Sequence, residues 1–501
     1  MSSTDLKEKE QTPSAASIDK VEGASTEVDP AFERRTMYER FFNNTPKSVL
    51  TFLLHRLWID FRILPVLALV YSFALIDRIN LGAAYAAGMG KDLHLTVGSR
   101  YSLVACLYFV PYIIFQLPGN LVLRRVGVRN WLTFLVVAWG AVQLGMGFSK
   151  DWIDLLITLF ADDCLPPQAP FFPSLLWIIA SWYKRHEVQK RMAVFYLISV
   201  TASGLSPLLA YGLSLLNGKQ GLAGWRWVFI VEGAITLFLA IVCFLFIPAF
   251  PEENTFLTKE QTELVVRRVN EDRGDALPDE ITFKKVLTHL SDWTLWAYGL
   301  MFMCTAMPNY VQSYFVPIIL TGMGYSPRDA LLRSAPPYGP AIPVTLLVAY
   351  LSDKYKHRAS FILVLSLICL LGCALVAWHP NNNLINLMRK GCFLINSGNS
   401  GTIPTVLAYS ANNVVSHSKR SVQTALTVSL GAFGGILAAT CFRAVDYPRY
   451  IPGLSATLGS QGLLFILLTA VTIRHYRKNK LMREGKLSEP LEGTPGFFYT
   501  L

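Results

Sequence analysis

Residues 359–378 read ASFILVLSLICLLGCALVAW, a run of twenty residues without a single acidic or basic side chain. A helix of about 20 residues is long enough to cross the hydrocarbon core of a bilayer. Backbone groups inside lipid must find their hydrogen-bond partners within the chain, so such a run has to be helical. This stretch therefore predicts a membrane-spanning helix and decides the class of the whole protein.

Similar blocks recur along the 501 residues, of which 52% are hydrophobic and only 16% are charged. An average soluble protein carries about 25% charged residues. A polar stretch divides the blocks into two groups of six, which predicts an all-α integral membrane fold with twelve transmembrane helices in two bundles. The predicted spans are approximately 62–84, 100–122, 130–148, 152–181, 192–215, 225–248, 294–320, 332–352, 359–378, 385–407, 420–441 and 457–476.

The polar segments set the domain boundaries. Residues 1–30 have almost no large apolar side chains and are typical of a disordered tail. Residues 31–61 mix aromatic and basic groups, which is typical of a helix lying at a membrane interface. The expected parts are an N-terminal tail 1–61, a first bundle 62–248, a linker 249–293 with a short amphipathic helix, a second bundle 294–476 and a C-terminal tail 477–501.

Basic residues gather in the loops that follow the second, fourth, eighth and tenth blocks. Lys and Arg near a membrane mark the cytoplasmic side. The opposite loops also carry some charge, for example Arg328 and Arg443, so the bias is moderate. We predict that the basic loops and both tails are cytoplasmic. The net charge of +11 then reflects the membrane surface and not nucleic acid.

Several kinds of chemistry find no support in the sequence. The eight cysteines form no CxxC pair and fall almost entirely inside apolar blocks, so we expect packing roles and no metal site. The chain has no GxxxxGK[ST] loop and neither an HExxH nor a GxSxG motif. We therefore expect no catalytic residue and no cofactor, and the protein is not predicted to be an enzyme.

Ordered motifs over residues 60–480 carry a family resemblance. They are LIDRINLG at 75–82, SWYKRHEVQKRMAVFY at 181–196, GWRWVFIVEG at 224–233, GMGYSPRDA at 322–330 and AYLSDKYKHR at 349–358. The chain resembles fungal members of the anion:cation symporter family of the major facilitator superfamily, which includes permeases for allantoate, nicotinate and pantothenate. The resemblance implies a major facilitator fold and a plasma-membrane permease with a substrate site between the two bundles.

Two adjacent charges, Asp77 and Arg78, lie inside the first predicted span. A charge in a spanning helix costs at least a few kcal/mol and is a functional candidate. The resemblance implies that Arg78 binds a substrate carboxylate, which a guanidinium fork matches well. It also implies that Asp77 takes part in proton coupling. The alternative is a structural ion pair near the outer end of the helix.

The fourth block departs from the family pattern. Where relatives have an arginine and a glutamate, this chain has Ala161 and Gln168. Two acids, Asp162 and Asp163, lie close by, and four prolines within 166–173 argue against a regular helix. Three interpretations stay open: these acids replace the proton carrier, the helix is shifted, or the chain has lost proton coupling.

The superfamily's loop motif, which closes the cytoplasmic gate by charge pairing, is nearly complete in the second half. Asp353, Lys354 and Arg358 match it there. In the first half Arg124 occupies the acidic position, while Arg129 is retained. The resemblance implies gating roles for all five residues, with the first latch built differently.

Other polar side chains within the spans are candidates for lining a substrate cavity, or else for hydrogen bonds between helices. They are Asn80, Tyr310, Gln312, Asn396 and Asn399. For Glu232 in the GWRWVFIVEG motif we expect a structural role, buried toward a neighbouring helix. Gly431, Gly435 and Ala439 repeat every four residues, which favours a close helix contact.

These observations favour a secondary transporter that takes up a small organic anion, a carboxylate or ureide, with protons by alternating access. Its expected partners are the anion, protons and lipid, with no nucleic acid, and it is expected to be a monomer. Two alternatives remain: an exporter of a secondary metabolite, and a nutrient sensor of the same fold that does not transport. The fold alone does not choose among them.

Overall fold

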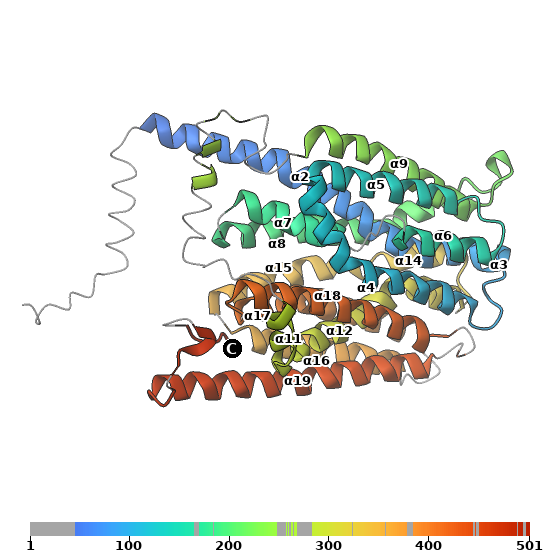
Figure 1. The fold of residues 1–501 in the computed structure, drawn as a ribbon. Coiled ribbons are helices and arrows are strands. Elements are labelled where there is room, and N and C mark those ends of the chain that lie inside the picture. The colour runs from blue at the N-terminus through green and yellow to red at the C-terminus, as the bar shows by residue number, and fades with distance from the viewer. Residues whose placement is uncertain are drawn as a thin grey trace, which may run out of the picture. The chain divides into compact units, whose positions relative to one another are not determined.

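The computed structural model describes residues 46–501 with gaps, and every regular element in the described part is a helix (Figure 1). The gaps are residues 165–169, 184, 248–256, 258, 260, 261, 264, 268–282, 323, 356, 378–383, 444, 445, 447–449, 488 and 494–496. The predicted disordered tail and most of the linker lie outside the described residues. The chain divides into a small unit, Met1–Phe61, and a large unit, Arg62–Leu501.

Helices lie in all six predicted blocks of the first half. In the fourth block the described residues form two helices, α6 and α7, and residues 165–169 between them lie outside the described part. The elements are α2 (Pro46–Ala84), η2 (Tyr85–Met89), α3 (Gly90–Asp92), α4 (Arg100–Val126), α5 (Val128–Met146), α6 (Trp152–Cys164), α7 (Phe171–Trp182), α8 (Arg185–Ser214) and α9 (Gly224–Phe246).

The second half follows the same plan. Its first predicted block is divided between α12 and α13, and α14 starts with Ser326 capping the backbone N–H of Asp329 at 3.1 Å. The elements are α11 (Phe283–Leu290), α12 (Trp293–Tyr314), α13 (Val316–Gly322), α14 (Pro327–Ser334), α15 (Tyr338–Tyr355), α16 (Arg358–Ala377), α17 (Leu384–Asn412), α18 (His417–Cys441) and α19 (Ile451–Arg483).

Six helical segments of the described residues are long and apolar enough to cross a membrane: Asp60–Asp92, Leu197–Ser214, Gly224–Phe246, Arg358–Ala377, Ser418–Cys441 and Ile451–Arg483. Large apolar side chains point outward from several of them, for example Phe238 on α9, Val364 on α16 and Ile466 on α19. Such side chains are stable in lipid and costly in water. The helices thus bury one side in protein and present the other to a bilayer.

Helices pack mainly within their own half. In the first half α5 packs on α9 and α4 packs on α6, and in the second half α12 packs on α18 and α16 packs on α17. One core cluster nevertheless joins the halves, since it includes Tyr101 and Phe109 from the first and Tyr314, Phe315 and Phe442 from the second. The ring of Tyr101 meets that of Phe315 edge-on at 5.7 Å. The two halves are therefore in direct contact along an aromatic seam.

Glycines let the halves approach closely along this seam. A Cβ at Gly82 of α2 would lie 2.6 Å from the carbonyl oxygen of Tyr314 on α12. A Cβ at Gly435 of α18 would overlap the ring of Phe109 on α4. The close contact predicted for Gly435 therefore exists, and it joins helices of different halves. Both positions need glycine because a side chain would push the halves apart.

The end of the chain folds back onto the second half. α19 continues to Arg483, beyond its predicted span, and residues after it return to the ends of α17 and α19. Asn479 exchanges two hydrogen bonds with the backbone of Tyr499, at 2.8 and 2.9 Å, and Asn413 does the same for Thr500, at 3.1 and 2.8 Å. The Tyr499 ring also stacks on His475 at 4.2 Å. The predicted tail thus has a docked portion.

Charged groups reinforce this docking. Lys419 at the start of α18 contacts Glu492 and Asp292, each at 2.9 Å, and Arg474 contacts Asp292 at 3.3 Å. Partial burial alone would raise the pKa of Asp292, but hydrogen bonds from Thr294 and Lys419 outweigh it and hold the pKa well below its usual range. The Asp292 carboxylate therefore connects the end of the linker to Lys419 of α18 and Arg474 of α19.

Candidate functional site

A cavity inside the first half brings the two predicted intramembrane charges together. It has about 450 Å³ of empty space, including its open mouth. Asp77 and Arg78 line it, together with neutral side chains of which half are aromatic. The other lining residues are Leu81, Tyr108, Trp139, Gln143, Met146, Leu159, Phe229 and, from the second half, Tyr314.

Arg78 lies among tyrosines. Its guanidinium carbon is 5.0 Å from the ring centre of Tyr112 and 5.9 Å from that of Tyr108, both on α4. Tyr71 of α2 and Tyr310 of α12 are also close enough to interact with its charge. Aromatic faces attract a cation and leave its N–H groups able to donate to a carboxylate. This aromatic surrounding stabilises the charge of the guanidinium.

Helical geometry sends Asp77 and Arg78 in different directions. Neighbours on a helix point about 100° apart, whereas residues three positions apart share a face. Gln143 of α5 accordingly donates a hydrogen bond to Asp77, and Asn80, three residues on, donates one to Glu232 of α9. Arg78 instead faces α4. Helix α2 therefore presents the cation of Arg78 to α4. It presents Asp77 and Asn80 to polar side chains of α5 and α9.

The polar network lies deep in the first bundle. Asn80 and Glu232 are completely buried, and Gln143 is 2% exposed. Ser206 of α8 donates to the Oδ1 of Asn80 at 3.4 Å. Asn80 was predicted to bind substrate, but in this structure its side chain is occupied by Glu232 and Ser206. The structure thus places it one layer behind the cavity wall.

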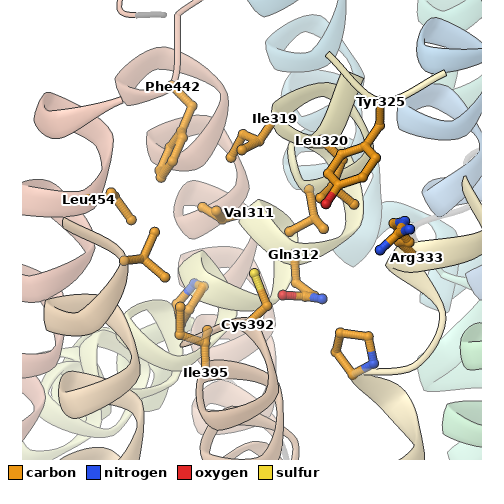
Figure 2. A pocket seen from close by; sticks show the side chains of 14 residues that line it. Val311, Gln312, Ile319, Leu320, Tyr325, Arg333, Cys392, Ile395, Phe442 and Leu454 are labelled. Atoms are coloured by element: carbon orange, nitrogen blue, oxygen red, sulfur yellow. The ribbon is translucent and has the colours of Figure 1, made fainter. Parts of the chain in front are cut away.

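A second pocket lies in the other half and has a different character (Figure 2). It has about 780 Å³ of empty space including its mouth. Gln312 of α12 reaches it from a mostly apolar wall, and Arg333 of α14 lies exposed over the Tyr325 ring at 4.5 Å. The apolar wall includes Val311, Ile319, Leu320, Cys392, Ile395, Phe442 and Leu454.

The structure distributes the other predicted liners between these two regions. Tyr310 stacks on Tyr314 at 5.9 Å and belongs to the surroundings of Arg78, whereas Gln312 belongs to the second pocket. Asn396 and Asn399 of α17 are buried, at 2% and 3% exposure, and Asn396 accepts a hydrogen bond from Ser400 at 3.3 Å. Neither asparagine is among the residues that line these two cavities.

The predicted gating and proton-coupling residues are only partly described. The side chains of Asp162, Asp163, Arg124 and Asp353 lie outside the described part of the chain. Among the others, Arg129 donates to the Phe244 carbonyl at the end of α9, Lys354 is exposed, and Arg358 is buried at the start of α16. A cation beside a helix C-terminus is favourable, so Arg129 holds α5 to α9 within one half.

Sequence analysis did not single out Gln143, Tyr108 or Tyr112. Gln143 is the polar side chain that contacts Asp77, and a lone glutamine within the apolar block 130–148 was a usable signal. Tyr108 and Tyr112 are four residues apart and therefore share one face of α4. Their partner could not be known before the helices were placed. Among the described residues no group of His, Cys, Asp and Glu could hold a metal ion.

The sequence of this chain is similar to those of known membrane transporters. The sequence model of the Major Facilitator Superfamily matches residues 67–439. The transporter hxnP of Emericella nidulans, described as major facilitator-type, is 30% identical over 477 residues, which cover 93% of each chain. The high-affinity nicotinic acid transporter of Saccharomyces cerevisiae is 25% identical over 438 residues, which cover 86% of this chain and 80% of that one.

Solved structures share the fold. The xylose transporter XylE from Escherichia coli, in a partially occluded inward-open conformation, superposes with a TM-score of 0.62 at 14% identity, covering 83% of this chain and 99% of that one. The human organic anion transporter MFSD10 gives a TM-score of 0.55 at 13% identity, with 82% and 99% covered. At such low identity the likeness concerns the arrangement of helices alone, and it agrees with the predicted fold.

Proposed function

Because the chain belongs to the Major Facilitator Superfamily and is thus a multi-pass membrane transporter, we propose that it takes up a small organic carboxylate together with protons. In this proposal it acts as an anion:cation symporter of the plasma membrane with both tails in the cytoplasm. Residues 62–248 rock against residues 294–476 to switch access from one side to the other. The basic loops on one side of the predicted topology support this orientation.

The observation that carries the proposal is Arg78, a permanent cation in the wall of a cavity within the spanning part. A guanidinium stays charged at any working pH and its planar fork matches a carboxylate. The rings of Tyr108 and Tyr112 lie 5.9 and 5.0 Å from its guanidinium carbon and stabilise its charge inside the bundle. An anion is the ligand that such a site binds most favourably.

The side chains that line the cavity favour a flat and partly apolar anion. Trp139, Phe229 and Tyr314 line the same cavity, and rings of this kind pack well against planar ligands. A pyridine carboxylate such as nicotinate combines a ring with a carboxylate, and the related yeast transporter is named for nicotinic acid. We therefore place aromatic and heteroaromatic monocarboxylates first among the candidate substrates.

The decisive experiment measures uptake of radiolabelled carboxylates into liposomes that contain the purified protein. The panel has nicotinate, benzoate, pantothenate and allantoate, each assayed with and without an inward proton gradient. We expect saturable uptake of at least one ring carboxylate, raised by the gradient. Nicotinamide is the matched control, because it keeps the ring but replaces the carboxylate by a neutral amide.

Each result separates the candidates. Equal uptake of nicotinate and nicotinamide would contradict an anion site at Arg78. Accumulation driven only by an outward gradient would support the exporter. Saturable binding without flux in well-folded protein would support the sensor. Uptake that ignores the gradient would leave an anion transporter that has lost proton coupling, as the altered fourth block allows.

A further inference from the structure

The pocket of the second half lies at one end of that bundle. Every residue that lines it falls within 308–454, so the first half contributes none. Gln312 is near the end of α12, Phe442 directly follows α18, and Leu454 belongs to the first turn of α19. The opposite ends of these three helices join the linker or a basic segment that we assign to the cytoplasm. The pocket therefore lies toward the outer side of the predicted topology.

Gln312 brings a buried hydrogen-bond donor to this pocket. The residue is 5% exposed, and among the described residues its Nε2 has no hydrogen-bond partner. Figure 2 shows its amide pointing into the pocket. A buried N–H group without an acceptor is unfavourable, and buried polar groups are normally paired for that reason. A ligand that places an acceptor atom here supplies the missing partner.

Arg333 gives the same pocket a positive charge at its mouth. The residue is exposed, and its guanidinium carbon lies 4.5 Å from the ring centre of Tyr325. No acidic side chain in the described part of the chain forms an ion pair with it. An exposed arginine attracts anions and matches the two oxygens of a carboxylate. The charged end of a ligand is therefore expected at the mouth, with its apolar part inside.

The remaining wall selects the body of the ligand. It is mostly aliphatic with one phenyl ring and includes Val311, Ile319, Ile395 and Phe442. Such a surface favours an apolar ring over a strongly hydrated group. The pocket thus suits a ligand with an anionic group, an apolar body and one acceptor within that body. A heteroaromatic carboxylate combines all three, whereas benzoate lacks the ring acceptor and nicotinamide lacks the charge.

We propose that this pocket is a second binding site for heteroaromatic carboxylates, which we call the outer site. The carboxylate contacts Arg333, the ring lies against the apolar wall, and the Nε2 of Gln312 donates to the ring acceptor. The ligand class rests on the proposed function, because it is that of the proposed substrates. The outer site collects the substrate at the outer side before it reaches Arg78.

Helix α12 separates the outer site from the cavity of the first half. Tyr314 lines that cavity, while Gln312, two residues earlier, lines the pocket. Residues two positions apart point to different sides of a helix. The two sites therefore do not share one ligand, and the protein can hold two carboxylates at once.

The test uses Cys392, whose thiol lines the pocket and is partly exposed. Unaltered protein in lipid nanodiscs is treated with N-ethylmaleimide at rising nicotinate or benzoate concentration, and mass spectrometry measures the alkylation of each cysteine. We expect nicotinate to protect Cys392 at an about threefold to tenfold lower concentration than benzoate, the effect of one neutral hydrogen bond. Cys106 of α4, partly exposed and outside the pocket, is the internal control. Equal protection by the two acids would overturn the proposal.

Two substitutions assign the contacts. Gln312→Leu should abolish the preference for nicotinate and leave protection by benzoate unchanged. Arg333→Ala should weaken nicotinate by about twofold to threefold, because the contact is exposed, and should not affect nicotinamide. A preference for nicotinate that survives in Gln312→Leu would contradict the assigned hydrogen bond.

Equilibrium dialysis with labelled nicotinate tests the outer site without relying on the thiol or on transport. Binding should persist in Arg78→Ala, because the outer site has no residue from the first half. Complete loss of binding in a folded Arg78→Ala protein would refute the second site. Binding that persists while the unaltered protein takes up no carboxylate would instead refute the proposed function and leave the outer site intact.

Discussion

The cavity of the first half and the pocket of the second half differ in where their charge lies. In the first half Arg78 and Asp77 are in the cavity wall and are connected to a buried network. In the second half neutral Gln312 lines the pocket, and the charged lining residue, Arg333, is exposed over the Tyr325 ring. Burying charge in a spanning bundle is costly and needs surroundings that stabilise it. Among the residues that line the two cavities, such surroundings are found in the first half.

This difference suggests a division of labour. In the proposed function, the half with the ionised groups recognises the anion and its proton, and the other half encloses the substrate with apolar surface. Tyr314 and Tyr310 of α12 reach from the second half toward Arg78. Movement of that half would therefore change the aromatic surface around the proposed anion while the charges stay in place. The substitutions below test this comparison and the docking of the tail.

The largest effect is expected from Arg78→Ala. Loss of one partner of a buried charge pair costs about 2–5 kcal/mol, so uptake at low substrate concentration should fall by roughly 30-fold or more. Arg333→Ala is the matched control, because it removes an arginine from the exposed mouth of the other pocket. It should lower uptake less than about threefold. Similar losses from both variants would abolish the distinction between the two halves.

Next in size is the change at the seam between the halves, Gly82→Ala. The new Cβ would meet backbone atoms of Tyr314 and Ser313 within 2.8 Å, and backbone cannot rotate away. We expect the contact between the halves to open and turnover to fall by about tenfold, equivalent to about 1.4 kcal/mol. Turnover is measured as the maximal uptake rate per protein in liposomes.

Gly212→Ala in α8 provides the steric control, since nothing lies within 4 Å of its added Cβ. It should transport normally. A Gly82→Ala protein with normal turnover would mean that the halves need not come this close during the cycle.

A smaller effect is expected from Gln312→Leu in the second pocket. Removing a neutral hydrogen bond costs about 0.5–1.5 kcal/mol, so the substrate concentration at half-maximal uptake should rise by about threefold to tenfold. The pH profile should not change, because this half carries none of the proposed proton chemistry. A shifted profile in this variant would show that the halves share that chemistry.

The smallest effect on transport is expected at the docked tail. Glu492→Gln weakens the contact with Lys419 but leaves both cavities untouched, so uptake should stay within about twofold. The backbone N–H groups of Tyr499 and Thr500 should nevertheless exchange with deuterium faster, because their partners Asn479 and Asn413 are held less firmly. Mass spectrometry of the C-terminal peptide measures this, with Glu484→Gln as the control.

Acidic pH should also speed deuterium exchange in the docked tail, because it protonates Asp292. The pKa of its carboxyl is lowered in the folded protein, so its stabilising contribution is present above the unfolded value of about 4. The contribution is lost as the pH falls through the lower folded value. Exchange in the tail should therefore rise below about pH 4 and less so in Asp292→Asn, which has already lost the charge. An Asp292→Asn tail that responds to acid as the unaltered one does would exclude this link.

The sequence predicted the fold because apolar block length has a direct physical meaning in a bilayer, and the all-helical major facilitator fold is confirmed. It also predicted Asp77 and Arg78 as candidates, because charges stand out in an apolar run. What Gln143 contacts could not be predicted, since that depends on how α5 faces α2. For the same reason Glu232 was expected to be buried, but its partner Asn80, 152 positions away, was not foreseen.

Trp139 gives the cavity a property of practical use. Its indole is 2% exposed, lines the same cavity as Arg78 and lies 6.1 Å from the ring of Phe171. A ring carboxylate bound in this cavity, as proposed, would exchange the atoms around this indole, and indole emission depends on its local environment. Since the chain has eleven tryptophans, the difference between the unaltered protein and Trp139→Phe isolates the signal. The transporter thus carries its own optical probe, and occupancy can be followed in real time without a label.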